Sequence, residues 1–443
     1  MTTDTRSRVR AGRRRTARRT VAAGTLLVTA LLAAAPAATA SGPAGAAAAS
    51  AADRQDRQDR QDEGRRGALL DITPVAALDR EQVSAFLSGT GIDAGGVRYG
   101  VRAYRLTYRT VTPTGAPTTA TGLLVLPRGG AHRLSLVSDT HGTMAHRDYA
   151  PSVGESFGRL SPYLHAARGR AVAAPDYLGL GRGPGRHPYM DTRSSVSASL
   201  DMLRAARQAA RRLDRPLTGD VYVTGFSQGG QVAMGLGREL TRGADPGFRL
   251  RALAPISGPY DIEGSETPGA LDGRVEPGSA VFYFSYFLTA QNRLRPLYRD
   301  PAEVFRAPYA GFVEDLFDGT HGEEEIVGRL PGTLDELFTA DFLERLRHPS
   351  GELLRTFRAN DVTCDWRPDV PVRLYTAAGD RDVPIANSRA CAADLARHGR
   401  KATVVDQGAV NHFGAFGTSA PRIADWFDAL DTRPARAEGG GAR

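Results

Sequence analysis

Two serines of this sequence lie in the pattern Gly-x-Ser-x-Gly, which can present a nucleophile where a strand turns sharply into a helix. The pattern occurs at residues 154–158 and at residues 225–229. Its glycines relieve crowding at such a turn and leave the serine oxygen above the edge of a sheet. Ser227 follows a β-branched run at 221–224 and precedes a helix-like stretch with small residues, whereas Ser156 follows a loop-like stretch. We therefore expect Ser227, and not Ser156, to be the nucleophile.

A serine hydroxyl needs a base, which is usually a histidine that a carboxylate orients. On sheets that carry this turn, the chain order is serine, acid, histidine. Four histidines follow Ser227: His321 and His348 lie in a helical insertion, and His398 lies at the charged end of a helix. His412 follows the last predicted strand, in a loop before the final helix predicted from Pro421 onward. His412 is therefore the expected base.

The acid should follow the predicted strand at residues 372–375, where residues 379–384 read Gly-Asp-Arg-Asp-Val-Pro. Asp380 stands three residues before the valine, and Asp382 stands three residues after the glycine. Both spacings are compatible with the acid. We favour Asp380 and keep Asp382 as the alternative; the other aspartate would be a turn or helix-capping carboxylate.

Hydrolysis through a tetrahedral intermediate also needs two N–H donors for the negatively charged oxygen. One is expected from the backbone of Gln228, directly after the nucleophile. The other is expected from Thr143, in the His-Gly-Thr-Met loop at residues 141–144, where the glycine lets the backbone approach a substrate. His141 is then a structural residue rather than the base.

The elements that must position these residues alternate along the chain. The predicted strands are at residues 97–111, 123–126, 134–137, 171–174, 221–223, 250–256, 372–375 and 403–405. The stretches between several of them have helical spacing, which predicts an α/β fold with a mostly parallel sheet flanked by helices. Residues 261–361 lack β-rich runs and are rich in aromatic residues and helix formers, which indicates an inserted helical cap.

At these residues the sequence resembles the α/β-hydrolase superfamily, and within it the secreted lipases and esterases with a helical cap. The resemblance covers roughly residues 68–430 and includes Pro-Asp-Tyr-Leu-Gly-Leu-Gly at 175–181, the Ser227 turn, Asp380-x-x-Val-Pro and the late His412. It implies an eight-stranded sheet, a Ser-Asp-His triad and no cofactor.

The sequence departs from the family pattern at two places. Ala377 stands where a glycine often precedes the acid by three residues, which keeps Asp382 open as the acid. The loop at residues 141–144 also lacks the aspartate that some capped secretory lipases carry there. Ester hydrolysis is therefore better supported than lipase specificity.

Charge and composition indicate export. The chain has 443 residues and a net charge of +8, and residues 1–40 contain eight arginines and one aspartate, so almost all of that charge lies there. An apolar run at residues 21–35 and Ala-Thr-Ala at 38–40 complete a signal peptide. We expect secretion by the Sec or twin-arginine route. The apolar run, of about 15 residues, is too short for a stable membrane anchor.

The rest of the chain is expected to form one α/β-hydrolase domain at residues 67–431, between a low-complexity leader at 41–66 and a tail at 432–443. It carries almost no net charge and no basic stripe, so no nucleic-acid partner is expected. The sequence has no His-Glu-x-x-His and no phosphate-binding loop, so we expect neither a metal nor a cofactor. We expect a monomer.

Cys364 and Cys391 are the only cysteines. In an exported protein they are expected to form a disulfide, worth about 3 kcal/mol for a loop of this length. The sequence thus predicts a secreted serine hydrolase that cleaves carboxylic esters of small molecules or lipids. The alternatives are a secreted exopeptidase, which needs a charged anchor such as the carboxylates at 323–325, and a non-catalytic binding protein with the same fold.

Overall fold

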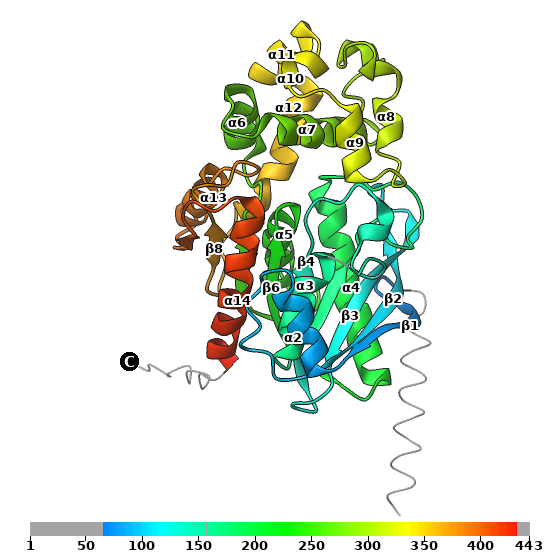
Figure 1. Cartoon of the computed structure of the whole chain (residues 1–443), viewed down its shortest axis with the longest axis vertical. Helices are drawn as coiled ribbons and strands as arrows, with labels where there is room; N and C mark the ends of the chain where they lie inside the picture. The colour runs from blue at the N-terminus through cyan, green and yellow to red at the C-terminus, as the bar shows by residue number, and fades with distance from the viewer. Residues whose placement is uncertain (1–64, 156, 432–443) are drawn as a thin grey trace, which may run out of the picture. The chain divides into compact units, whose positions relative to one another are not determined.

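One twisted sheet with helices on both faces forms the lower part of the molecule, and a helical cap lies at one end of it (Figure 1). The computed structural model describes residues 65–155 and 157–431. The expected signal peptide at 1–40, nearly all of the leader, the tail at 432–443 and Ser156 lie outside the described residues.

Within the described residues, nine strands form the sheet in the order β1-β2-β3-β5-β4-β6-β7-β8-β9. Their bounds are β1 (Leu69–Leu78), β2 (Val101–Val111), β3 (Pro117–Pro127), β4 (Leu134–Thr140), β5 (Ala171–Pro175), β6 (Leu217–Phe226), β7 (Arg249–Ile256), β8 (Arg373–Thr376) and β9 (Thr403–Asp406). The strands from β5 to β9 run parallel, whereas β1, β2 and β3 pair antiparallel, and β3 pairs antiparallel with β5. The functional loops leave the parallel part, at the carboxyl ends of its strands.

The sheet has one strand more than the eight that the resemblance implied. The additional strand is β1, which lies at the edge and pairs antiparallel with β2. It contains Pro74, and its register shifts between Pro74 and Ala76. A proline cannot donate to the ladder and is tolerated only at an edge or a bulge, so this segment lacks an ordinary strand signature.

Each face of the sheet has its own apolar core. One face packs against α4 (Thr192–Arg212), α5 (Gln228–Thr241) and α13 (Ala386–Arg397). The other packs against α2 (Arg80–Ser88), α3 (Leu160–Ala167) and α14 (His412–Asp431). The final helix therefore begins at His412, and not near Pro421 as the sequence suggested. Pro421 lies inside the helix.

The cap is inserted between β7 and β8, as expected. Its helices are η3 (Ile262–Glu266), α6 (Thr267–Asp272), α7 (Pro277–Asn292), α8 (Val313–Leu316), α9 (Glu323–Arg329), α10 (Leu334–Leu337), α11 (Ala340–Arg347) and α12 (Gly351–Asp361). These helices surround a third apolar core. Helix α7 contributes four buried aromatic side chains to it, Phe282, Phe284, Tyr286 and Phe287.

A disulfide joins Cys364, at the end of the cap, to Cys391 on α13. Both cysteines are buried in the core between α13 and the sheet. The structure therefore contains the bridge that the two cysteines led us to expect. Across residues 65–155 and 157–431, none of the helices combines the length and the apolar character needed to cross a bilayer.

Candidate active site

Ser227 occupies the sharp turn between β6 and α5. Its backbone has φ = 57° and ψ = −126°, a strained conformation for a residue with a side chain. The two flanking glycines are required by space: a Cβ on Gly225 would lie 2.1 Å from Thr140 Oγ1, and one on Gly229 would lie 1.9 Å from the Thr140 carbonyl oxygen. The turn therefore fits tightly against the end of β4 and holds the serine at the edge of the sheet.

His412 and Asp380 form a buried hydrogen-bonded pair. His412 Nδ1 lies 2.7 Å from Asp380 Oδ2, and both side chains are almost completely shielded from solvent. The other carboxylate oxygen, Oδ1, accepts the backbone N–H groups of Asp382 at 3.0 Å and Val383 at 2.9 Å. Because an ionised carboxylate only accepts, the proton of the neutral imidazole lies on Nδ1. His412 Nε2 is buried without a partner among the described residues, so it can accept a proton.

The structure thus brings Asp380, and not Asp382, to His412. The backbone N–H of Asp382 donates to Asp380 Oδ1. Asp382 has no hydrogen bond to His412 among the described residues, and it borders a hollow beside Ser227. Ser227 and His412 border a common second hollow, and no hydrogen bond joins Ser227 to His412 Nε2 in this structure. Hydrogen bonds between such groups often tighten only when a substrate is present.

Gln228 directly follows Ser227, and Thr143 borders the same hollow as both. Gln228 is the first residue of α5, and the first N–H groups of a helix have no partner within the helix. A Cβ built on Gly142 would lie 3.2 Å from Ser227 Cβ, so the loop that carries Thr143 passes directly beside the serine. Both expected donor residues therefore lie close to Ser227.

His141 is held by the backbone. Its Nδ1 lies 2.6 Å from the Gly142 carbonyl oxygen, and its ring packs against Tyr177 with 4.2 Å between centroids and a tilt of 36°. Burial lowers the pKa of His141, so the ring stays neutral. Asp176 organises the loop after β5 by accepting hydrogen bonds from the Ser152 N–H at 2.9 Å and from Thr121 Oγ1 at 2.5 Å.

The cap contacts the Thr143 loop through Tyr286, whose ring stacks on Tyr189 from the segment before α4. The ring centroids of Tyr189 and Tyr286 are 4.1 Å apart, and the angle between the two ring planes is 7°. The hydroxyl groups of Tyr189 and Thr143 are 2.8 Å apart, and the Tyr286 hydroxyl donates to the Met144 carbonyl oxygen at 3.2 Å. Helix α7 of the cap, which carries Tyr286, therefore fixes the backbone that bears one of the expected N–H donors. No sequence pattern indicated these contacts.

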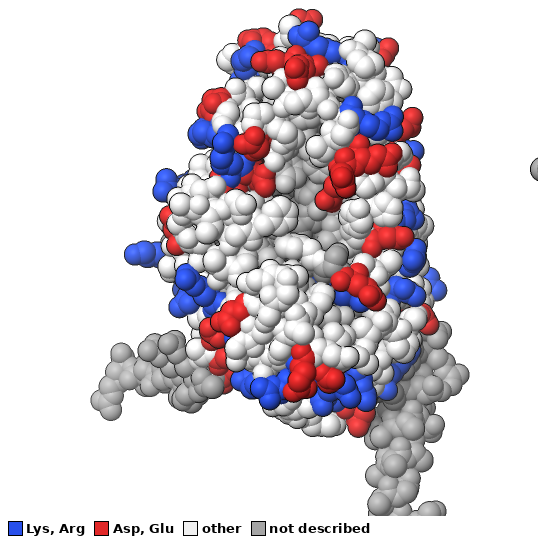
Figure 2. Space-filling view, viewed as in Figure 1, with Lys and Arg blue, Asp and Glu red and all other residues white. Residues whose placement is uncertain are grey.

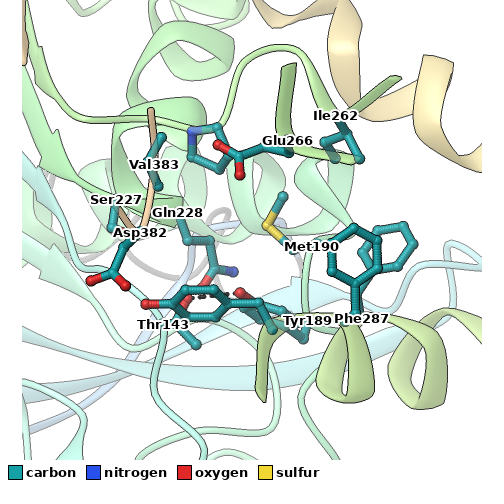
Figure 3. Close-up of a pocket in the computed structure, with 13 residues that line it drawn as sticks. Thr143, Tyr189, Met190, Ser227, Gln228, Ile262, Glu266, Phe287, Asp382 and Val383 are labelled. Atoms are coloured by element: carbon teal, nitrogen blue, oxygen red, sulfur yellow. Dashed lines mark hydrogen bonds between the residues drawn. The ribbon is translucent and has the colours of Figure 1, made fainter. Parts of the chain in front are cut away.

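Ser227 borders two hollows. On the face seen in Figure 2, the surface is hollowed between the cap and the part that carries the sheet. The first, here called the Gln228 hollow, has about 60 Å³ of free space. Its walls include Phe284 and Phe287 of α7, and its charged residues are Glu266 and Asp382 (Figure 3).

The second, here called the His412 hollow, has about 300 Å³ of free space. It is bordered by His412 and Glu323 and by two side chains with large exposed fractions, Phe413 and Tyr149. Burial raises the pKa of Glu323, while the Ala145 N–H opposes that shift.

Comparisons with solved structures point to one fold. A putative hydrolase from Legionella pneumophila matches with a TM-score of 0.76 and 26% identity over 83% of this chain and 100% of that chain. The rice cell wall degrading esterase LipA from Xanthomonas oryzae matches with a TM-score of 0.72 and 29% identity, over 83% and 100%. Lipase A from Candida antarctica matches with a TM-score of 0.59 and 14% identity, over 84% of each chain.

The chain has the α/β-hydrolase fold. Its similarity to these hydrolase, esterase and lipase structures agrees with the resemblance that the sequence motifs indicated. No protein-family model matches the sequence, and no curated protein matches it. In an α/β hydrolase the nucleophile, acid and base follow one another along the chain. Here Ser227 follows β6, Asp380 follows β8, and His412 follows β9.

Proposed function

We propose that this protein is an exported serine hydrolase that cleaves carboxylic esters. Ser227 is the nucleophile, His412 is the base, and Asp380 is the acid that orients it. The observation that carries the proposal is the buried pair of His412 and Asp380, because His412 borders the same hollow as the strained serine turn and its Nε2 has no partner among the described residues. An imidazole held by a carboxylate can activate a hydroxyl group within its reach.

The reaction begins when Ser227 Oγ attacks the ester carbonyl carbon while His412 Nε2 takes its proton. The resulting oxyanion accepts hydrogen bonds from the Gln228 and Thr143 N–H groups, each of which is typically worth about 10²–10³ in rate. The imidazolium then gives its proton to the leaving alcohol, and an acyl-enzyme remains. Water attacks this ester with His412 again as the base, and the acid is released as Ser227 recovers its proton.

The position of His412 indicates which part of the ester occupies each hollow. The leaving oxygen must lie within reach of the imidazolium that protonates it, so the alcohol part of the ester occupies the His412 hollow. The acyl part then lies in the Gln228 hollow, which Ser227 borders but His412 does not. Because a water molecule needs roughly 10–15 Å³ of such space, the 60 Å³ there admits about four to six small groups. The preferred acyl chain is therefore short.

Export is part of the proposal. The disulfide between Cys364 and Cys391 supports it, because disulfides persist in oxidising compartments. The expected signal peptide also supports it, although residues 1–40 lie outside the described part of the chain.

The test is hydrolysis of 4-nitrophenyl esters of graded chain length by the purified protein, beside aminoacyl anilides as peptidase substrates. We expect turnover of acetate to hexanoate esters with a maximum near butyrate, and weak turnover of palmitate. Cleavage of anilides without cleavage of any ester would instead identify a peptidase. No turnover of either class by folded protein would refute hydrolysis.

A further inference from the structure

The charged side chains of the Gln228 hollow are all acidic. Among the described residues that border it, Glu266 and Asp382 carry carboxylates, and none is an arginine or a lysine. The chain as a whole has 57 arginines and lysines, so scarcity of basic residues does not explain their absence here. The hollow is therefore bordered by two carboxyl groups and by no basic side chain.

Glu266 is held in place without a positive partner. Its Oε1 accepts a hydrogen bond from Asn387 Nδ2 at 2.5 Å, whereas Oε2 has no hydrogen-bond partner among the described residues. Burial and then the negative charge of Asp380 raise the pKa of Glu266 well above its usual value. Asp380 is already paired with His412, and Asp382 adds to the same shift. A positive group in the hollow would relieve this repulsion.

Gln228 supplies a second, independent feature. Its side chain is buried, and Nε2 donates to His187 Nε2 at 3.4 Å. His187 is the acceptor because its Nδ1–H donates to the Leu178 carbonyl oxygen at 2.8 Å. This contact orients the amide and leaves Gln228 Oε1 buried with no donor among the described residues. An unpaired buried acceptor is costly, so this oxygen indicates a bound group with a donor.

We propose that the Gln228 hollow binds a short acyl chain that ends in a primary ammonium group. The ammonium donates to Gln228 Oε1 and is attracted by the carboxyl groups of Glu266 and Asp382, while the methylene groups lie against Phe284 and Phe287. A primary ammonium supplies three donors, which match the acceptors that Glu266, Asp382 and Gln228 Oε1 offer. This substrate class, esters of amino acids, rests on the proposed ester hydrolysis.

The experiment compares three methyl esters of equal chain length by acid release at pH 7, with enzyme-free blanks. The 4-aminobutyrate ester carries an ammonium group, the pentanoate ester carries a methyl group in its place, and monomethyl succinate carries a carboxylate. We expect kcat/KM for the aminobutyrate ester to exceed that for the pentanoate ester by about tenfold or more, with the succinate ester slowest.

Variants locate the effect. Glu266→Gln and Asp382→Asn should each lower the ratio of aminobutyrate to pentanoate kcat/KM about fivefold. Asp335→Asn is the matched control, because it removes an exposed carboxylate of the cap, on α10, and should leave the ratio unchanged. Circular dichroism verifies that each variant is folded, and either pocket variant suffices if the other does not fold.

The outcomes separate the two proposals. If the pentanoate ester is cleaved but kcat/KM is no higher for the aminobutyrate ester, the ammonium site is refuted and ester hydrolysis stands. The same holds if kcat/KM is highest for the succinate ester. An unchanged ratio in both folded pocket variants also refutes the site. If none of the methyl esters and no 4-nitrophenyl ester is cleaved, the proposed function itself fails.

Discussion

Replacing Asp380 with asparagine should reverse the protonation of His412. The backbone N–H groups of Asp382 and Val383 donate to Asp380 Oδ1, so an asparagine at this position would keep its carbonyl oxygen toward them. Its NH₂ group would then face His412 Nδ1, in place of the oxygen that now lies 2.7 Å away. A donor at that position requires Nδ1 to accept, which moves the imidazole proton to Nε2.

With Nε2 protonated, His412 cannot take the proton of Ser227. Reversing the tautomer in this way typically lowers kcat by about 10⁴, which corresponds to about 5.5 kcal/mol of transition-state stabilisation. Asp382→Asn removes the same charge two residues away but leaves the pair of His412 and Asp380 intact. On a neutral ester we expect it to lower kcat by no more than about tenfold.

The assay measures kcat and KM for 4-nitrophenyl butyrate with both variants and the unaltered protein, from pH 5 to pH 9. Near-ultraviolet circular dichroism verifies that the tertiary packing is retained. If folded Asp380→Asn keeps more than about a tenth of the activity, the hydrogen bond to His412 has no catalytic role. If Asp382→Asn loses far more than Asp380→Asn, the acid is Asp382 and our assignment is wrong.

Three further outcomes follow from the structure. Tyr286→Phe removes the hydrogen bond to the Met144 carbonyl oxygen and should lower kcat about three- to tenfold with little change in KM; an effect on KM alone would refute a role in positioning the loop. Replacing Cys364 and Cys391 with serine should lower the free energy of unfolding by about 3 kcal/mol in urea titrations, and an unchanged midpoint would show that the bridge adds no stability. Burial raises the pKa of Asp139 to about 6, so folding favours its neutral form and the protein loses about 3 kcal/mol as the pH rises from about 4 to 6. Asp139→Asn should therefore raise Tm at pH 8 but not at pH 4, and an equal effect at both pH values would contradict this reasoning.

The sequence predicted those parts of the site that depend on local backbone geometry. The serine turn requires small residues at both flanking positions, and the close contacts of Gly225 and Gly229 with Thr140 show why. Asp380 was identified from its spacing to Val383, and the structure gives a physical reason, because the Val383 N–H orients the carboxylate.

The start of the last helix was placed wrongly because a proline near a helix is usually one of its first residues. Pro421 instead lies inside α14, and the helix begins nine residues earlier. Asn411 directly precedes it, and its Oδ1 accepts the Gly414 N–H at 2.8 Å. An asparagine in this position caps the first turn of a helix, so the helix can begin well before its proline.

The contacts between the cap and the site could not be predicted from the sequence. Tyr286 and Met144 are separated by 142 positions along the chain, and their hydrogen bond depends on how the cap packs against the sheet. Glu266 belongs to no motif, and it borders the Gln228 hollow only because η3 directs it there. Long-range packing of this kind leaves no local pattern of residue types.

The most direct test of the account is the site of covalent attack. The purified protein is treated with an alkyl fluorophosphonate, which reacts with activated serines, and peptide mass spectrometry then locates the adduct. We predict one adduct, on Ser227, with loss of ester hydrolysis in proportion to labelling, and no adduct and no hydrolysis in folded Ser227→Ala. An adduct on another residue, or ester hydrolysis that persists in Ser227→Ala, would contradict the assignment of Ser227 as the nucleophile.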